Sequence, residues 1–149
     1  MNRYYLIDLP VTQYTAVPRL LPVLPTSLKR LRSHVERFAR YYLRELGAGG
    51  VMFEISESPM SLGFVPYKAF LLIAQDRFIG SACFSHREDQ DLLTPWLCQW
   101  LWIHPYFRRH GVLTHTWPEL KRQVGPFRLG KPLSSHMQAF IAKVGHTEA

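Results

Sequence analysis

Residues 103–113 are the part of this chain best suited to binding an anion. They read Ile-His-Pro-Tyr-Phe-Arg-Arg-His-Gly-Val-Leu and follow a run of β-branched and aromatic residues. Positive or potentially positive charge gathers before the glycine, at Arg108, Arg109 and His110. A strand that passes through such a loop into a helix presents main-chain N–H groups to an anion. The pattern predicts a phosphate or pyrophosphate site, and an ordinary basic surface turn is the alternative.

Histidine is the other residue type near this loop that could act as an acid or base. His104 stands at the end of the predicted strand, and the pKa of an unperturbed imidazole lies near neutrality. Strand alternation favours the alternative that His104 faces solvent. The spacing of His104, His110 and His115 is typical of no common metal motif, so we expect no metal site.

Composition narrows the class of protein. The chain has 149 residues, is 47% hydrophobic and carries a formal net charge of +7, which favours an anionic partner. This length predicts a single domain over residues 1–149. No apolar run approaches the roughly 20 residues of a membrane helix, so we expect no membrane partner. Cys83 and Cys98 are too few for a disulfide framework, which favours a cytoplasmic protein.

The clearest helix is predicted over residues 26–46, with Thr26 or Ser27 as its cap. Apolar residues at three- and four-residue steps define its buried stripe, formed by Leu28, Leu31, Val35, Phe38 and Tyr42. A second face is basic and carries Arg30, Arg37, Arg40 and Arg44. This face is either a solvated surface or an electrostatic platform for nucleic acid or an acidic protein.

Apolar runs bounded by turn residues predict strands over residues 67–74, 78–85, 96–103 and 127–129. The proline-rich segment 1–25 contributes a further short strand over residues 4–9. Three tryptophans, Trp96, Trp100 and Trp102, alternate along one strand. They are expected to share a face, either packed in the core or exposed as a stacking surface.

Two helices are predicted after the basic loop. The first covers residues 114–124, where Pro118 either kinks the helix interior or begins a late helix capped by Thr116. The second begins at Ser134 or Ser135 and runs through Lys143.

The loop resembles the signature of the GNAT acetyltransferases, hydrophobic-x-Pro-x-x-Arg-x-x-Gly-x-small, matched here by Ile103, Pro105, Arg108 and Gly111. Leu113 departs from it, because the family usually has glycine or alanine there. The doubled arginine and Trp102 look like the cohesin-acetylating branch and related phage- and plasmid-encoded members. The resemblance covers residues 67–146. It implies an α+β fold with a central, mostly antiparallel twisted sheet flanked by helices, and acetyl-CoA as cosubstrate.

The resemblance also implies a set of site residues. The coenzyme pyrophosphate would be held by main-chain N–H groups and basic side chains of Arg108, Arg109, His110, Gly111, Val112 and Leu113. Trp102 and Ile103 would hold the pantetheine arm by strand-like pairing. Ser134 and Ser135 lie where related enzymes place polar residues near the acetyl group, so they join His104 as catalytic candidates, with helix capping as the serines' alternative role. Ile141 replaces the tyrosine that often protonates the thiolate, so a different acid, or none, is expected.

These features together predict an acetyl-CoA-dependent N-acetyltransferase whose acceptor is an amine on a protein lysine, a small molecule or a nucleic acid. The alternative is a catalytically inactive GNAT-derived module that binds nucleic acid or protein. Few residues follow the last predicted helix, so the last strands of a full GNAT sheet are expected to be missing. The sheet would then be completed by the N-terminal segment, a second copy of the chain or a partner chain.

Overall fold

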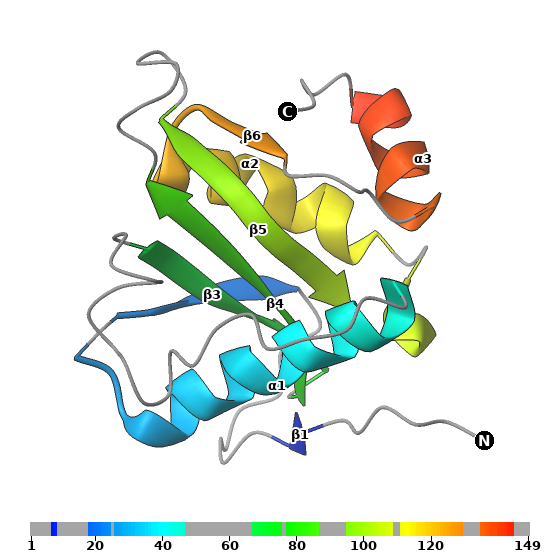
Figure 1. Cartoon of the computed structure of the whole chain (residues 1–149). Coiled ribbons are helices and arrows are strands. Elements are labelled where there is room, and N and C mark those ends of the chain that lie inside the picture. The colour runs from blue at the N-terminus through cyan, green and yellow to red at the C-terminus, as the bar shows by residue number, and fades with distance from the viewer. Residues whose placement is uncertain are drawn as a thin grey trace.

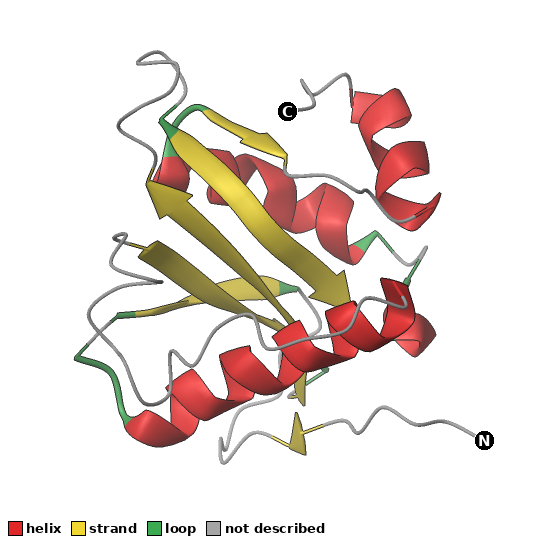
Figure 2. Ribbon diagram, in the orientation of Figure 1, coloured by secondary structure: helices red, strands yellow, loops and turns green. Residues whose placement is uncertain are grey.

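The computed structural model describes residues 7–8, 18–24, 26–46, 67–75, 77–86, 95–108, 111–129 and 135–144. Their strands are β1 (Ile7–Asp8), β2 (Arg19–Val23), β3 (Tyr67–Ala74), β4 (Arg77–His86), β5 (Trp96–Ile103) and β6 (Phe127–Leu129). Their helices are α1 (Lys29–Leu46), the short 3-10 helix η1 (Pro105–Phe107), α2 (Val112–Val124) and α3 (Ser135–Val144). The expected mixed class is confirmed (Figure 2).

The strands form one sheet in the order β2-β3-β4-β5-β6, with β1 beside β4. The pairings are antiparallel except for that of β5 with β6, which is parallel. In Figure 1, α1 crosses in front of the sheet and α2 runs behind it. The sheet is therefore covered by helices on both faces, and each face has its own apolar core.

Polar contacts as well as apolar ones hold α1 to its face of the sheet. Val35 and Phe38 of α1 are fully buried against Trp100. The Trp100 indole N–H donates a hydrogen bond to the Ser81 hydroxyl over 2.9 Å, and Ser81 donates to the Val35 carbonyl over 3.2 Å. Because these buried polar groups are paired, the helix has a defined position on the sheet.

A β-bulge in β5 changes which face its side chains reach. The ladder between β4 and β5 passes over Gln99, which is the extra residue. Trp96 and Cys98, before the bulge, pack on the α2 side, whereas Trp100 and Trp102 pack under α1. The expectation that the three tryptophans share a face is therefore wrong for Trp96, because the bulge shifts the alternation by one residue. Trp100 and Trp102 are core residues.

The start of α1 differs from the sequence prediction. The helix begins at Lys29, and Leu28 is 65% exposed instead of buried. The Ser27 hydroxyl accepts a hydrogen bond from the Leu24 N–H over 2.8 Å, so it closes the preceding turn and does not cap the helix. The rest of the predicted stripe packs against the sheet, at Leu31, Val35, Phe38 and Tyr42. The four predicted arginines are exposed.

α2 begins at Val112, so Pro118 lies inside the helix and the late-start alternative is wrong. The buried Thr116 hydroxyl donates to the Val112 carbonyl over 2.9 Å and does not cap a later helix. At the other end, the Lys68 ammonium donates to the Val124 carbonyl over 3.4 Å. A cation there complements the negative end of the helix dipole.

The structure describes part of the first predicted strand and all of the last. β1 lies within the segment predicted to hold a first short strand, and in the part of the chain that the structure describes β6 is the last strand. None of the described helices combines the length and apolar character that a membrane span requires.

Candidate functional site

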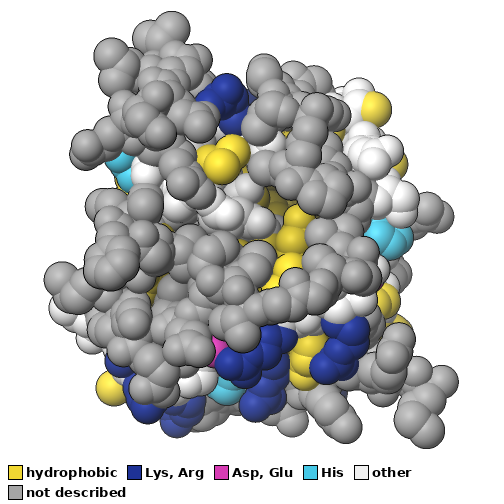
Figure 3. Space-filling model, in the orientation of Figure 1, with side chains coloured by type: hydrophobic (Ala, Val, Ile, Leu, Met, Phe, Trp, Pro, Cys, Tyr) yellow, Lys and Arg dark blue, Asp and Glu magenta, His cyan; other side chains and the backbone are white. Residues whose placement is uncertain are grey.

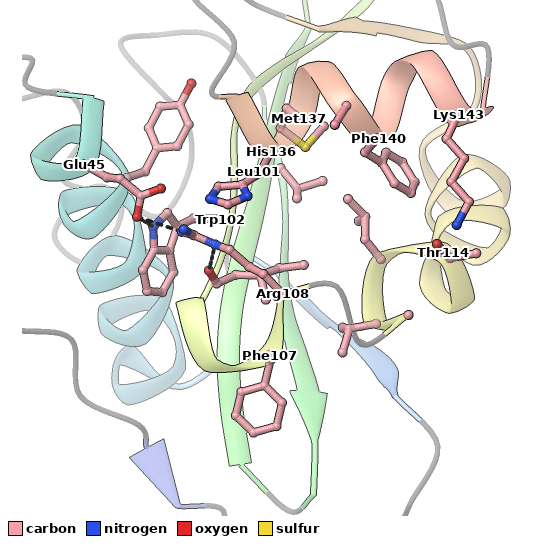
Figure 4. A pocket seen from close by; sticks show the side chains of 16 residues that line it. Glu45, Leu101, Trp102, Phe107, Arg108, Thr114, His136, Met137, Phe140 and Lys143 are labelled. Carbon is pink, nitrogen blue, oxygen red and sulfur yellow. Dashed lines mark hydrogen bonds and ion pairs between the residues drawn. The ribbon is translucent and has the colours of Figure 1, made fainter. Parts of the chain in front are cut away.

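A cavity of about 350 Å³ lies between the C-terminal half of β5 and the start of α2 (Figure 4). The C-terminal end of α1 forms another wall, and α3 forms the side opposite α1. Elements distant in sequence therefore meet at one hollow. Six residues that the sequence assigns to coenzyme binding line it, namely Trp102, Ile103, Arg108, Gly111, Val112 and Leu113.

The cavity exists because β5 and β6 separate. Their parallel pairing covers only Trp96 to Cys98, opposite Phe127 to Leu129. Beyond Cys98, β5 keeps its ladder with β4, while Leu101, Trp102 and Ile103 line the cavity. A strand edge that lacks a neighbouring strand offers main-chain donors and acceptors to an extended ligand. This part of β5 can therefore pair with an amide-bearing chain.

The start of α2 forms the second ligand-facing feature. Gly111 has φ 78°, a left-handed conformation that favours glycine, and no side chain caps the helix. The first N–H groups of an α-helix have no partner within the helix, and the helix dipole makes them favourable for an anion. Val112, Leu113 and Thr114 follow in the cavity wall. Arg109 and His110 lie outside the described residues.

Arg108 is held by the protein itself. Its Nε donates to the Ile103 carbonyl over 2.8 Å, and its Nη2 lies 2.7 Å from Glu45 Oε2 (Figure 4). The guanidinium also lies over the Trp102 ring, 5.5 Å from its centroid, and the Trp102 indole N–H donates to the same Glu45 oxygen over 3.2 Å. This arrangement, the Glu45–Arg108 clamp, ties the loop to the end of α1.

His104 is buried, so the expectation that it faces solvent is wrong. Its main-chain N–H donates to the Ile79 carbonyl over 2.7 Å, and its Nδ1 accepts from the Tyr106 N–H over 3.1 Å. Its side chain keeps the alternation of the strand and lies on the same face as Trp102, with the ring centroids 6.1 Å apart. That face is covered by α1 and not by solvent, so alternation leads to a buried position. His104 is not among the cavity-lining residues, and its contacts make it an anchor for η1.

The walls from α1 and α3 contain residues that the sequence analysis did not assign to the site. Tyr42 and Glu45 occupy one face of α1, and His136 and Lys143 project from α3 (Figure 4). Burial, and to a lesser degree Cys98, raises the pKa of Tyr42 to about 12, so its phenol is neutral at physiological pH. The helical spacing of these pairs was visible in the sequence, but their shared cavity was not.

The structure does not bring the two serine candidates, Ser134 and Ser135, into the described cavity wall. Ser135 is exposed at the start of α3 and does not line the cavity, and Ser134 lies outside the described residues. Ile141 is buried in the core, where it contributes packing and no proton. The described residues also contain no group of three metal-ligating side chains.

The two cysteines are free thiols inside the protein. Burial raises the pKa of both, well above that of an exposed thiol. A thiol that does not ionise is a poor nucleophile, so both cysteines are packing residues.

No protein-family model matches the chain, and no curated protein matches its sequence. Solved structures do. A tandem GNAT protein from the clavulanic acid biosynthesis pathway, without acetyl-CoA, aligns over 86% of this chain with a TM-score of 0.54 and 16% identity. This chain spans 43% of that tandem protein.

Two further structures match along most of their own length. AAC(6')-Iy, in complex with the bisubstrate analogue CoA-S-monomethyl-acetylneamine, aligns over 88% of this chain and 91% of its own, with a TM-score of 0.58 and 17% identity. An aminoglycoside acetyltransferase from an uncultured soil metagenomic sample aligns over 89% and 93%, with a TM-score of 0.58 and 13% identity. The chain therefore has the fold of the GNAT acetyltransferases.

Proposed function

We propose that this protein is an acetyl-CoA-dependent N-acetyltransferase that moves an acetyl group to an amine. The observation that carries the proposal is the cavity in which a strand edge meets an uncapped helix N-terminus. A coenzyme with an anionic diphosphate and an amide-bearing arm fits both features. One of the similar structures holds a CoA conjugate, which supports the same class of ligand.

Each feature has a distinct role in this proposal. The N–H groups after Gly111 would bind the diphosphate, since they are preorganised donors at the positive end of α2. The main chain of Ile103 faces away from β4 and would pair with the pantetheine arm, whereas the ladder turns the main chain of Trp102 toward β4. The apolar side chains Leu101, Met137 and Phe140 in the wall exclude water from the reacting groups.

The reaction consists of one substitution at the thioester carbon. The neutral amine nitrogen forms a bond to the acetyl carbon, the carbon–sulfur bond breaks, the nitrogen loses a proton, and the departing thiolate gains one. Tyr42 is the cavity-lining phenol and stays neutral, so we assign it to donating a hydrogen bond to the departing sulfur. The proton that the thiolate gains is the one that the amine nitrogen loses. Much of the acceleration would come from holding the two substrates together.

A charge placed in the helix N-terminus tests the diphosphate assignment. Thr114 is exposed, lines the cavity and is the third residue of α2. Glutamate at this position is favourable for a helix, because it complements the dipole. Thr114→Glu should therefore preserve or raise the melting temperature while repelling the diphosphate. We expect the Kd for CoA, measured by calorimetry, to rise about tenfold or more, which corresponds to ~1.4 kcal/mol.

Thr114→Gln is the matched control, since it has the same shape without the charge, and its Kd should stay within about threefold of wild type. A wild-type protein with no affinity for CoA or acetyl-CoA would overturn the proposal. Equal CoA affinity of the glutamate and glutamine variants would show that the diphosphate does not bind at the start of α2. Tight coenzyme binding without acetyl transfer to any member of an amine panel would instead support a binding module.

A further inference from the structure

The exposed face of α1 carries more positive charge than the helix itself can neutralise. α1 contains six cationic and two acidic residues. Glu36 is buried and forms an ion pair with Arg40, and Glu45 belongs to the Glu45–Arg108 clamp. Within the described length of α1, no carboxylate remains on the exposed face. Lys and Arg side chains gather along the path of this helix in Figure 3.

The cations form a regular stripe. Arg30, Arg37 and Arg44 follow one another at seven-residue intervals, and Arg40 lies on the same side. An α-helix rises 1.5 Å per residue, so the three are about 10 Å apart along the axis and the stripe is about 21 Å long. All four side chains belong to exposed residues. A stripe of this length matches a repeating anion better than a single small one.

The position of the charge is unfavourable for the helix alone. The first turn of α1 contains no acidic residue and holds Lys29, Arg30 and Arg32. Cations at that end add to the positive end of the helix dipole and destabilise it. An anion bound along the stripe would relieve this repulsion, so the same arrangement that weakens the free helix strengthens binding.

A neighbouring histidine reports the electrostatic field of the stripe. The pKa of His34 is lowered, first by burial and then by Arg37 and Arg30. His34 packs against Phe78, with the ring centroids 5.3 Å apart, so it lies between the stripe and the sheet. The positive charge of the stripe therefore lowers the pKa of a histidine that lies behind it.

We propose that the stripe formed by Arg30, Arg37, Arg40 and Arg44 binds the phosphate backbone of nucleic acid. All four positions are arginine, whose planar guanidinium matches phosphate with two parallel hydrogen bonds. Repeated contacts at this spacing fix a polymer through its backbone without reading its sequence.

The stripe also has a fixed relation to the cavity. Arg44 is followed directly by Glu45, which lines the cavity wall. A nucleic acid on the stripe would pass the end of α1 that forms this wall. A further consequence, which rests on the proposed function, is that the acceptor amine is carried by nucleic acid or by a molecule bound to it. The binding itself does not depend on acetyl transfer.

Fluorescence anisotropy with a labelled duplex DNA and a labelled single-stranded RNA tests the binding. The variant is Arg30→Gln with Arg37→Gln, because glutamine retains helix propensity. We expect its affinity for at least one of these nucleic acids to fall about tenfold or more. For duplex DNA, the slope of log K against log salt should become shallower by about 2, since each phosphate contact contributes about 0.9.

Lys121→Gln with Arg122→Gln on α2 is the matched control, because it removes the same charge from another exposed surface. Its affinity should stay within about twofold of wild type. Equal losses in the two variants, or no binding of either nucleic acid by the wild type, would overturn the proposal. A polyglutamate peptide that binds the wild type as tightly as nucleic acid would also overturn it, in favour of an acidic protein partner.

Titration of His34 by NMR gives a second readout. Phosphates that neutralise Arg30 and Arg37 should raise the pKa of His34 in the complex. An unchanged His34 pKa in a saturated complex would place the nucleic acid elsewhere on the protein and contradict the proposal.

Discussion

Both halves of β5 pair with β4, but only the first half also pairs with β6. From Trp96 to Cys98 the strand pairs with both β4 and β6. The residues after Gln99 pair with β4, and Leu101 to Ile103 line the cavity. Both halves are rich in tryptophan and leucine. Similar side chains therefore lie beside β6 in one half and beside the cavity in the other.

This difference indicates that backbone register creates the candidate site. The bulge at Gln99 lies where the strand stops pairing with β6. A bulge bends its strand and increases the local twist. On the opposite side, Gly80 allows β4 to approach β5 closely, because a Cβ atom there would lie 2.0 Å from the Trp102 carbonyl oxygen. The half of β5 that borders the cavity is thus bent at the Gln99 bulge and packed closely against β4 at Gly80.

Gly80→Ala should break the half of β5 that borders the cavity most severely. The added methyl group would collide with the main chain of Trp102, which cannot move without disrupting the ladder. We expect the free energy of unfolding, measured in urea, to fall by about 3 kcal/mol, and CoA binding to be lost. Gly125→Ala is the control, since that glycine has open space around it and its φ of 84° alone should cost about 1–2 kcal/mol. Equal losses in both variants would contradict the close-approach argument.

Deleting Gln99 should remove the difference between the halves while preserving the fold. Without it, Cys98 and Trp100 would follow each other in normal alternation, and each would keep its present face of the sheet. We expect unfolding stability to change by about 1–2 kcal/mol. The straighter strand would narrow the cavity, so the Kd for CoA should rise about tenfold or more.

Gln99→Ala controls for the lost side chain, which donates to Ser85 in the bulge. It keeps the extra residue and should keep the coenzyme affinity. A deletion variant that folds and binds CoA as well as wild type would show that the bulge does not set the cavity.

The sequence predicted the parts of the fold that depend on local pattern. Periodicity predicts the two strands on either side of Gln75 and the apolar stripe of the first helix. The structure confirms the strands, and it confirms the stripe except at Leu28, which is exposed. The bulge could not be predicted, because it depends on pairing between β4 and β5. For the same reason Trp96 was assigned to the wrong face. Pro118 is a case in which a local preference misleads. Proline is disfavoured inside a helix, yet α2 continues through it because the helix packs on the sheet.

The candidate site was predictable along one segment only. The loop spacing located Ile103, Arg108 and Gly111, which all line the cavity. The walls from α1 and α3 lie far apart in the sequence, and no local signal joins them. His104 was misplaced because helices cover both faces of the sheet, so strand alternation places its side chain beside Trp102 under α1 and not in solvent. The contacts of Arg108 depend on Glu45, which is distant in sequence.

The smallest expected effect comes from the Glu45–Arg108 clamp, and its sign distinguishes two roles for Arg108. Its side chain is 13% exposed and that of Glu45 25%, so the pair is partly shielded from solvent. Glu45→Gln keeps a hydrogen-bond acceptor but removes the charge. If Arg108 acts by holding the loop to Ile103 and Trp102, the variant should lose about 1 kcal/mol of stability, and its Kd for CoA should rise about fivefold.

If the Arg108 guanidinium instead contacts the diphosphate, releasing it from Glu45 should tighten CoA binding. We expect the weaker affinity, because Arg108 contacts Glu45, the Trp102 ring and the Ile103 carbonyl, and the last of these belongs to the main chain of β5. Arg108→Gln, alone and combined with Glu45→Gln, completes the double-mutant cycle in calorimetry. A coupling energy of about 1 kcal/mol that favours the wild-type pair supports the clamp. Tighter binding in Glu45→Gln that disappears when Arg108 is also replaced would assign Arg108 to the diphosphate.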